Sequence, residues 1–104
     1  MAKPKRDRTA RREAARAAVR DAKDREKLFL REPGGSAERA IVLESPSVVE
    51  PRARSVPCPL CGGEQEVVEH AAVSTDQGTL REARLKCRRC GSRRSLWFRV
   101  ALPN

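Results

Sequence analysis

The sequence has few aromatic residues and no long hydrophobic run. Among its 104 residues only Phe29, Trp97 and Phe98 are aromatic. Large side chains supply much of the area that a core can bury, so this scarcity argues against a large core. The length allows one domain at most, and we expect less than the full chain to pack into it. No run approaches the roughly eighteen apolar residues that a membrane-spanning helix needs, so we expect no membrane partner.

An apolar h-region is also missing from the first twenty residues, MAKPKRDRTARREAARAAVR, although they carry positive charge. A secretory signal peptide has such a region, so we expect an intracellular, cytoplasmic protein. Thiols are kept reduced in that compartment. Paired cysteines there indicate metal ligands rather than disulfides.

Acidic residues are in the minority. There are 14 Asp or Glu and 23 Lys or Arg, a formal net charge of +9, and two thirds of that excess lies in residues 1–32. The excess favours a polyanionic partner. We expect three parts: a basic Ala/Arg-rich helix over 1–32, a mostly disordered linker containing proline and glycine over 33–57, and an organised metal-binding part over 58–104.

The first part contains no glycine or proline between Pro4 and Pro33 and is rich in Ala, Arg, Lys and Glu. These residues have strong helix propensities. The pattern predicts one long α-helix that begins near Asp7 or Thr9 and ends before Pro33. It lacks a good apolar stripe, because the residues that share a face are mostly alanines, which bury little area.

The middle part contains four of the seven prolines and a pair of glycines, which indicates an extended and mostly disordered chain. Two short β-branched islands interrupt it, AIVL at 40–43 and SVV at 47–49. Either island can add as an edge strand to a sheet or to a partner, although a local apolar cluster is the expected state.

The last part reads as three strands. The stretches EQEVVEHAAVS (64–74), TLREARLKC (79–87) and SRRSLWFRVAL (92–102) are separated by a turn at TDQG and by CRRCG at 87–91. Period-two alternation places Leu96, Phe98, Val100 and Leu102 on one face of the third strand. The fold class we expect is a small metal-stabilised β domain, a three-stranded antiparallel sheet, preceded by the long helix and the linker.

The sharpest chemical signal is a pair of C-x-x-C motifs, Cys58 with Cys61 and Cys87 with Cys90, separated by 25 residues. Four thiolates suit one structural zinc ion, Zn²⁺. Gly62 and Gly91 follow the motifs and permit the positive φ of a metal-binding turn. Two local disulfides, a redox motif or free thiols are less favoured, and iron would use the same ligands. With all four positions filled by sulfur, the metal would fold the domain and perform no chemistry, so we expect no enzyme and no small-molecule substrate.

These residues resemble the zinc-ribbon family of transcription and translation proteins, over about Cys58 to Leu102. Among ribbons, those of transcript-cleavage elongation factors are similar in hairpin length and carry W-x-F after the last cysteine, where this chain has CGSRRSLWF. Their hairpin tip has an adjacent Asp-Glu pair, whereas this chain has Asp76 and Gln77, which argues against cleavage stimulation. The resemblance implies a binding or docking module for RNA polymerase, ribosome, DNA or RNA.

A row of basic residues follows the predicted helix at steps of three and four: Arg8, Arg12, Arg16, Arg20, Lys23 and Lys27. Neighbouring like charges at this spacing disfavour a helix by roughly 0.2–0.5 kcal/mol per pair, and a phosphate backbone would relieve that repulsion. No aromatic side chains interleave with the row, which indicates backbone contact with little sequence preference. A solvated charged helix is the alternative.

Three further residues near the second C-x-x-C are candidates. Arg88 and Arg89 either offset the negative charge of a metal tetrathiolate or bind phosphate, and Trp97 either packs or contacts a partner. We therefore expect a non-enzymatic accessory protein that binds nucleic acid or a nucleic-acid machine. The alternatives are a protein-interaction adaptor with a solvated helix and, less favoured, a redox or metal-handling protein.

Overall fold

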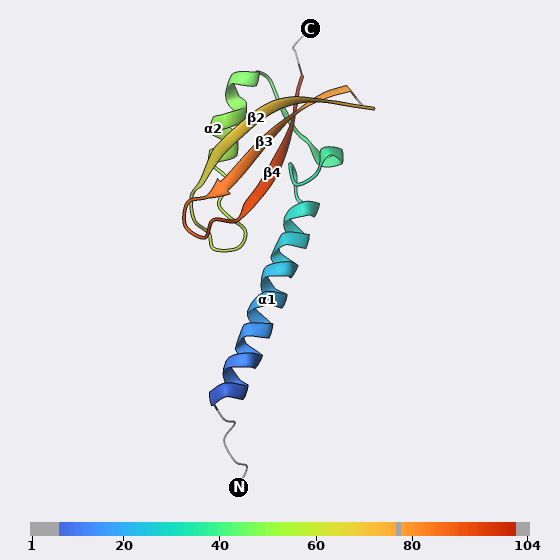
Figure 1. Ribbon diagram of the computed structural model, residues 1–104. Coiled ribbons are helices and arrows are strands. Elements are labelled where there is room, and N and C mark those ends of the chain that lie inside the picture. The colour runs from blue at the N-terminus through green and yellow to red at the C-terminus, as the bar shows by residue number, and fades with distance from the viewer. Residues whose placement is uncertain (1–6, 77, 102–104) are drawn as a thin grey trace.

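The computed structural model describes residues 7–76 and 78–101. Gln77 and Leu102, which the sequence analysis singled out, lie outside these residues. A long helix projects from a small sheet (Figure 1). The elements in chain order are α1 (Asp7–Arg31), η1 (Ala37–Arg39), β1 (Ile41–Leu43), η2 (Pro46–Val48), α2 (Val49–Arg54), β2 (Gln65–Thr75), β3 (Gly78–Cys87) and β4 (Arg93–Val100).

Helix α1 confirms the predicted long helix. It begins at Asp7, whose negative charge suits the positive end of the helix dipole, and it ends at Arg31. The Arg39 guanidinium donates to the backbone carbonyl of Arg31, and Gly34 adopts a φ of 83° just beyond the helix end. We name residues 7–24 the arm and the remaining described residues the body. None of the arm's residues is buried.

The sheet differs from the predicted one. Strands β2, β3 and β4 are antiparallel neighbours, as expected, but β1 pairs in parallel with β4, which gives a four-stranded mixed sheet in the order β1-β4-β3-β2. The expectation of a three-stranded antiparallel sheet is therefore wrong. Strand β1 comes from the AIVL island, for which an edge strand was the less favoured interpretation, and Ile41 lies opposite Phe98.

Residues 33–57 form η1, β1, η2 and α2, instead of the mostly disordered linker expected. Burial offsets the entropy cost of ordering this segment, because Val49 and Ala53 of α2 have no exposed surface. The prolines fit the helices that contain them. Pro46 begins η2 and Pro51 lies in the first turn of α2, where a missing N–H costs no intrahelical hydrogen bond.

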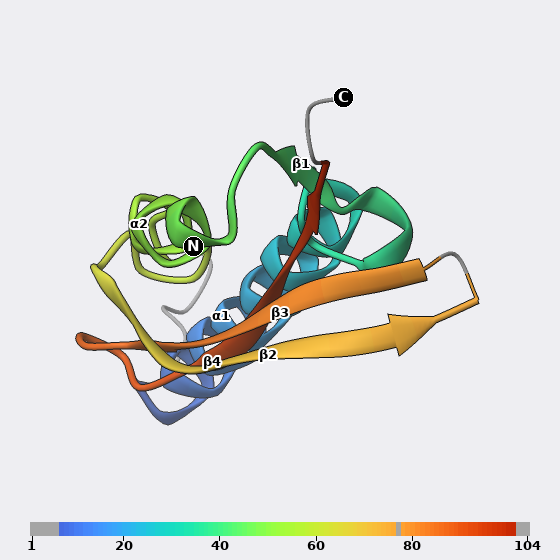
Figure 2. The same cartoon turned by 90° about the horizontal axis from the view of Figure 1, so that it is seen from above.

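The core lies on one face of the sheet. Figure 2 shows α2 and the end of α1 on the same side of the strands. Phe29 of α1 packs with α2 and with the inward side chains of β3 and β4, and the buried cluster consists of Phe29, Val49, Ala53, Ala83, Leu85, Leu96 and Phe98. Within the described residues no helix has the length and hydropathy that crossing a membrane requires.

Candidate metal centre and basic arm

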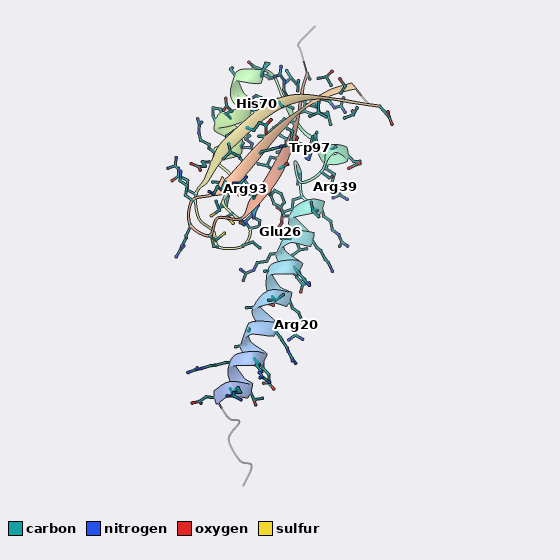
Figure 3. All side chains as sticks on the ribbon, in the orientation of Figure 1. Arg20, Glu26, Arg39, His70, Arg93 and Trp97 are labelled. Carbon is teal, nitrogen blue, oxygen red and sulfur yellow. The ribbon has the colours of Figure 1, made fainter. Side chains whose placement is uncertain are left out.

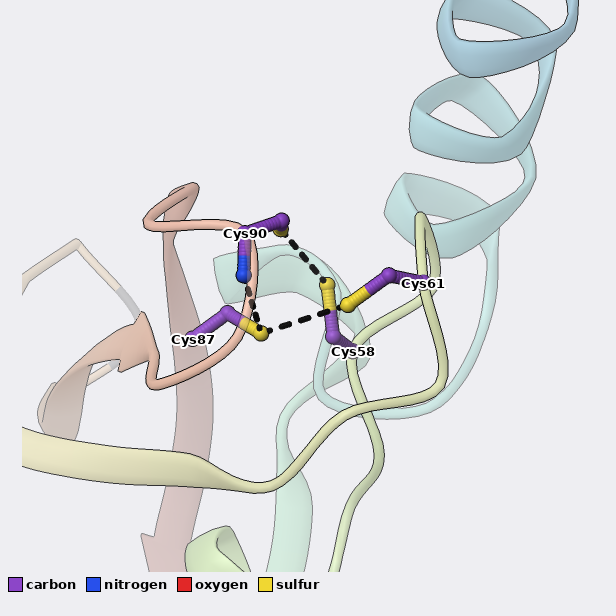
Figure 4. Close-up of side chains that lie close together, drawn as sticks. All are labelled: Cys58, Cys61, Cys87 and Cys90. Atoms are coloured by element: carbon purple, nitrogen blue, oxygen red, sulfur yellow. Dashed lines mark hydrogen bonds between the residues drawn. The ribbon is translucent and has the colours of Figure 1, made fainter.

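The four cysteines gather at one end of the sheet. One sulfur from each of Cys58, Cys61, Cys87 and Cys90 lies within 4.8 Å of all the others. Figure 4 shows the pairing across the two motifs: the Cys58 and Cys90 sulfurs are 3.7 Å apart, and those of Cys61 and Cys87 are 3.4 Å apart. These spacings suit four thiolates around one ion, at roughly 2.3 Å each. The four cysteines could therefore hold one metal ion.

Two equivalent turns aim the sulfurs. In the first, the Gly62 N–H donates to the Cys58 carbonyl over 2.8 Å. In the second, the Gly91 N–H donates to the Cys87 carbonyl over 3.0 Å. Gly62 and Gly91 have φ angles of 74° and 76°, as the sequence predicted. A side chain would be strained at this φ, so glycine lets both turns close around the sulfurs.

Gly63 has a separate role, which the sequence analysis missed. A Cβ at this position would lie 2.8 Å from the Arg89 Cβ and 3.2 Å from the sulfurs of Cys61 and Cys87. The Gly63 N–H also donates to the Cys61 sulfur over 3.4 Å. Lack of a side chain at Gly63 thus allows the two turns to approach each other. The only sequence signal was the doubled glycine after the first motif.

Hydrogen bonds favour the thiolate form at three cysteines. Burial raises the pKa of the Cys58 thiol, but hydrogen bonds from Ser92 and from the backbone of Cys61 and Leu60 outweigh burial and lower it. A backbone N–H from Cys90 lowers the pKa of Cys87, and the Ser92 hydroxyl lowers that of Cys90.

Cys61 behaves differently. The Gly63 N–H lowers the pKa of Cys61, but hydrogen bonding with the Cys87 sulfur, together with burial and the other two cysteines, raises it to about 11. Four close sulfurs cannot all carry negative charge without a cation, and this mutual repulsion keeps the pKa of Cys61 above its usual range. A divalent ion at the centre would favour the thiolate at all four positions.

A buried arginine contacts the cluster, and the sequence analysis missed it. The Arg94 side chain is 3% exposed, and its guanidinium donates to the Cys58 sulfur over 3.5 Å and to the Ser92 hydroxyl over 2.6 Å. Its other partner is Glu26 of α1, at 3.1 Å. One signal was available, because period-two alternation places Arg94 on the same inward face as Leu96 and Phe98.

Arg88 and Arg89 lie on the second turn, where the sequence placed them. The Arg88 guanidinium is 3.4 Å from Glu66, and the Arg89 backbone N–H donates to the Cys87 sulfur over 3.3 Å while its side chain is exposed. Trp97 is half-buried on β4, and its backbone N–H donates to the Gly34 carbonyl. The buried guanidinium of Arg94, by contrast, donates directly to one of the four sulfurs.

The basic row lies along α1, and all six of its members, Arg8, Arg12, Arg16, Arg20, Lys23 and Lys27, are exposed. At about 100° per residue, Arg12, Arg16 and Arg20 are turned roughly 100–180° around the helix from Phe29, which contacts the core. Glu13 borders that face, because it lies about 20° around the helix from Arg20. In Figure 3 Arg20 lies on the part of α1 that extends away from the sheet, whereas Glu26 lies next to the sheet.

The arm row and the arginines of the second turn lie on different elements. Two α1 residues that reach the cysteine turns are Arg25, whose guanidinium donates to the Leu60 carbonyl over 2.8 Å, and Glu26, which acts through Arg94. Comparison of the chain with protein-family models, curated proteins and solved structures finds no match, so the metal centre and the arm are interpreted from their own geometry.

Proposed function

We propose that this chain is a non-enzymatic accessory protein of the zinc-ribbon type, which binds nucleic acid through the basic face of α1. One structural zinc ion held by the four cysteines would stabilise the body. The observation that carries the proposal is the exposed basic face of the arm. The arm ends next to Arg25, whose guanidinium contacts Leu60 between the first two of the four clustered cysteines. A positively charged surface would then project from a helix whose C-terminal end is held by the folded domain.

The donor set supports zinc. Four thiolates from two C-x-x-C turns are typical of structural zinc sites, and iron accepts the same ligands. Elemental analysis of protein purified under reducing conditions tests the assignment. We expect one equivalent of zinc per chain, lost when Cys61 and Cys90 are both replaced by serine. If the protein instead contains one equivalent of iron and is coloured, the metal is iron and not zinc. Protein that contains no metal would refute the metal centre.

The charge distribution supports the nucleic acid. Each phosphate that a Lys or Arg neutralises on duplex DNA contributes about 0.9 to the slope of log affinity against log salt. If about four of the six basic residues make contact, affinity falls roughly a hundredfold between 50 and 200 mM salt. Fluorescence anisotropy with labelled duplex DNA and RNA of mixed sequence measures this slope. Affinity that does not depend on salt, or no binding at 50 mM, would refute the proposal.

A matched pair of variants assigns the contact to the arm. Replacing Arg12 and Arg16 with alanine preserves helix propensity and should lower the salt slope by about 1.8, two contacts at about 0.9 each. Replacing Arg52 and Arg54 of α2, which are also exposed, removes the same charge from the body and should change the slope far less. Equal losses in the two variants would indicate attraction by net charge alone.

Purification from a lysate with and without nuclease separates this proposal from the adaptor alternative. Nucleic-acid binding predicts that nuclease releases the associated molecules. If a protein partner instead remains bound after nuclease treatment, and the Arg12 and Arg16 variant retains it, the chain is an adaptor and the arm is a solvated helix.

A further inference from the structure

Arg94 connects the cysteine cluster to α1. Its guanidinium contacts four groups from three parts of the chain: the Cys58 sulfur, the Ser92 hydroxyl, the Glu26 carboxylate and, at 5.7 Å from the ring centroid, Phe29. Glu26 and Arg94 are separated by 68 residues in the sequence. With its side chain 3% exposed, Arg94 is shielded from water while it makes these contacts.

The charge of Arg94 is only partly compensated by its protein neighbours. One carboxylate, that of Glu26, pairs with it, and its buried Nε has no hydrogen-bond partner among the described residues. A buried cation is costly unless it is paired. A divalent ion bound by four thiolates carries a net charge of −2 and would place that charge beside the guanidinium.

We propose that Arg94 is a positioning residue that couples metal loading to the arm: the charged metal centre holds Arg94, and Arg94 holds Glu26 and Phe29 of α1. This inference rests on the metal centre of the proposed function. Glu26 lies two residues beyond the end of the arm on α1. The contact between Arg94 and Glu26 therefore determines whether the basic face of the arm keeps a fixed direction relative to the sheet. The hydrogen bond from Arg25 to the Leu60 carbonyl also holds this end of α1 to the first cysteine turn.

The consequence is a metal-dependent presentation of the arm. In the loaded protein the last two turns of α1 are held against the core, Arg94 and the first cysteine turn through Phe29, Glu26 and Arg25. Without the metal, the cysteine turns lose the ion that joins them, so the Cys58 sulfur to which Arg94 donates is no longer held in place. The arm then remains a helix with its charges, but its direction relative to the sheet is not fixed.

The test uses the zinc-loaded full chain and the variant Glu26→Gln, which removes the charge from a side chain that is 37% exposed and leaves all four cysteines intact. Asp24→Asn is the matched control, because it makes the same charge change on the exposed side of α1. Hydrogen exchange of the amides in residues 25–31 reports how firmly α1 is held. We expect roughly tenfold less protection in Glu26→Gln than in the control, as for the loss of one charge-assisted hydrogen bond, with one equivalent of zinc still bound.

Cobalt(II), used as a probe metal, reports on the contact between Arg94 and the Cys58 sulfur. Arg94→Met removes the donor to the Cys58 sulfur and should shift the sulfur-to-cobalt absorption band, whereas Arg93→Met, an exposed neighbour on β4, should leave it unchanged. Arg94→Lys should restore part of the helix protection, because it restores the charge without the forked contacts.

The outcomes separate the two proposals. If neither zinc nor cobalt binds, the metal centre fails. If the metal binds and Glu26→Gln matches Asp24→Asn in α1 protection, the metal centre stands and the coupling is refuted. Should Arg94→Met not fold, the comparison of Glu26→Gln with Asp24→Asn still decides the question.

Discussion

The arm and the body of this chain are ordered by different forces. The arm consists of one helix without a buried residue, so its order comes from local hydrogen bonds and from residues with strong helix propensity. In the body, buried side chains from α1, α2 and the sheet pack together, and four cysteines from two distant motifs meet. Disturbances of long-range contacts should therefore affect the body and leave the arm's helix largely intact.

Removal of the metal should separate the two regions most clearly. A core of so few side chains contributes little stability, so we expect the fold of the body to depend on the metal. Structural zinc sites contribute their binding free energy directly to folding. Chelation should collapse the dispersed NMR signals of residues 58–101, while those of residues 7–24 keep their helical shifts. A chelated protein that retains dispersion over the sheet would show that packing alone folds the body.

A core truncation should have the next largest effect. Phe98 has no exposed surface and lies in the middle of the buried cluster, so Phe98→Ala should lower the free energy of unfolding of the metal-loaded protein by about 3–5 kcal/mol. Val19→Ala on the arm, where the residue is 55% exposed, should change it by less than about 0.5 kcal/mol. Similar losses in urea melts of both variants would contradict the division between arm and body.

Crowding between the cysteine turns should have a smaller and more local effect. Gly63→Ala would place a Cβ against the Arg89 side chain and two sulfurs, and should weaken zinc affinity about tenfold, or 1.4 kcal/mol, in a chelator competition. Gly62→Ala meets no atom within 4 Å and is strained only through its positive φ. We expect the cobalt(II) spectrum to shift more in Gly63→Ala than in Gly62→Ala.

Local patterns predicted much of this fold. The composition of residues 5–32 predicted α1 with a start near Asp7 or Thr9, and alternation between turn signals located the strands that became β2, β3 and β4. The C-x-x-C spacing predicted that four sulfurs would meet. Each of these features is encoded within a short window or a repeated motif, where propensity and periodicity are informative.

The features that the sequence did not reveal depend on distant partners. Strand β1 is three residues long, and it pairs because β4 presents a free edge to Ile41 and Leu43. Helix α2 is six residues long and contains Pro51, so propensity alone does not favour it, whereas burial of Val49 and Ala53 does. Arg94 looked like one of several basic residues, because its partner Glu26 lies 68 positions away.

The short strand β1 also protects the sheet against association with other chains. An exposed strand edge offers unpaired N–H and C=O groups to any extended segment, and β1 covers the part of this edge of β4 that runs from Phe98 to Val100. At the opposite border, β2 carries Glu66 and Glu69 and is interrupted by a bulge between Val67 and Glu69. Charge and irregularity at a border strand oppose edge-to-edge pairing. Three residues from the proline-containing segment therefore help to keep this small sheet from aggregating.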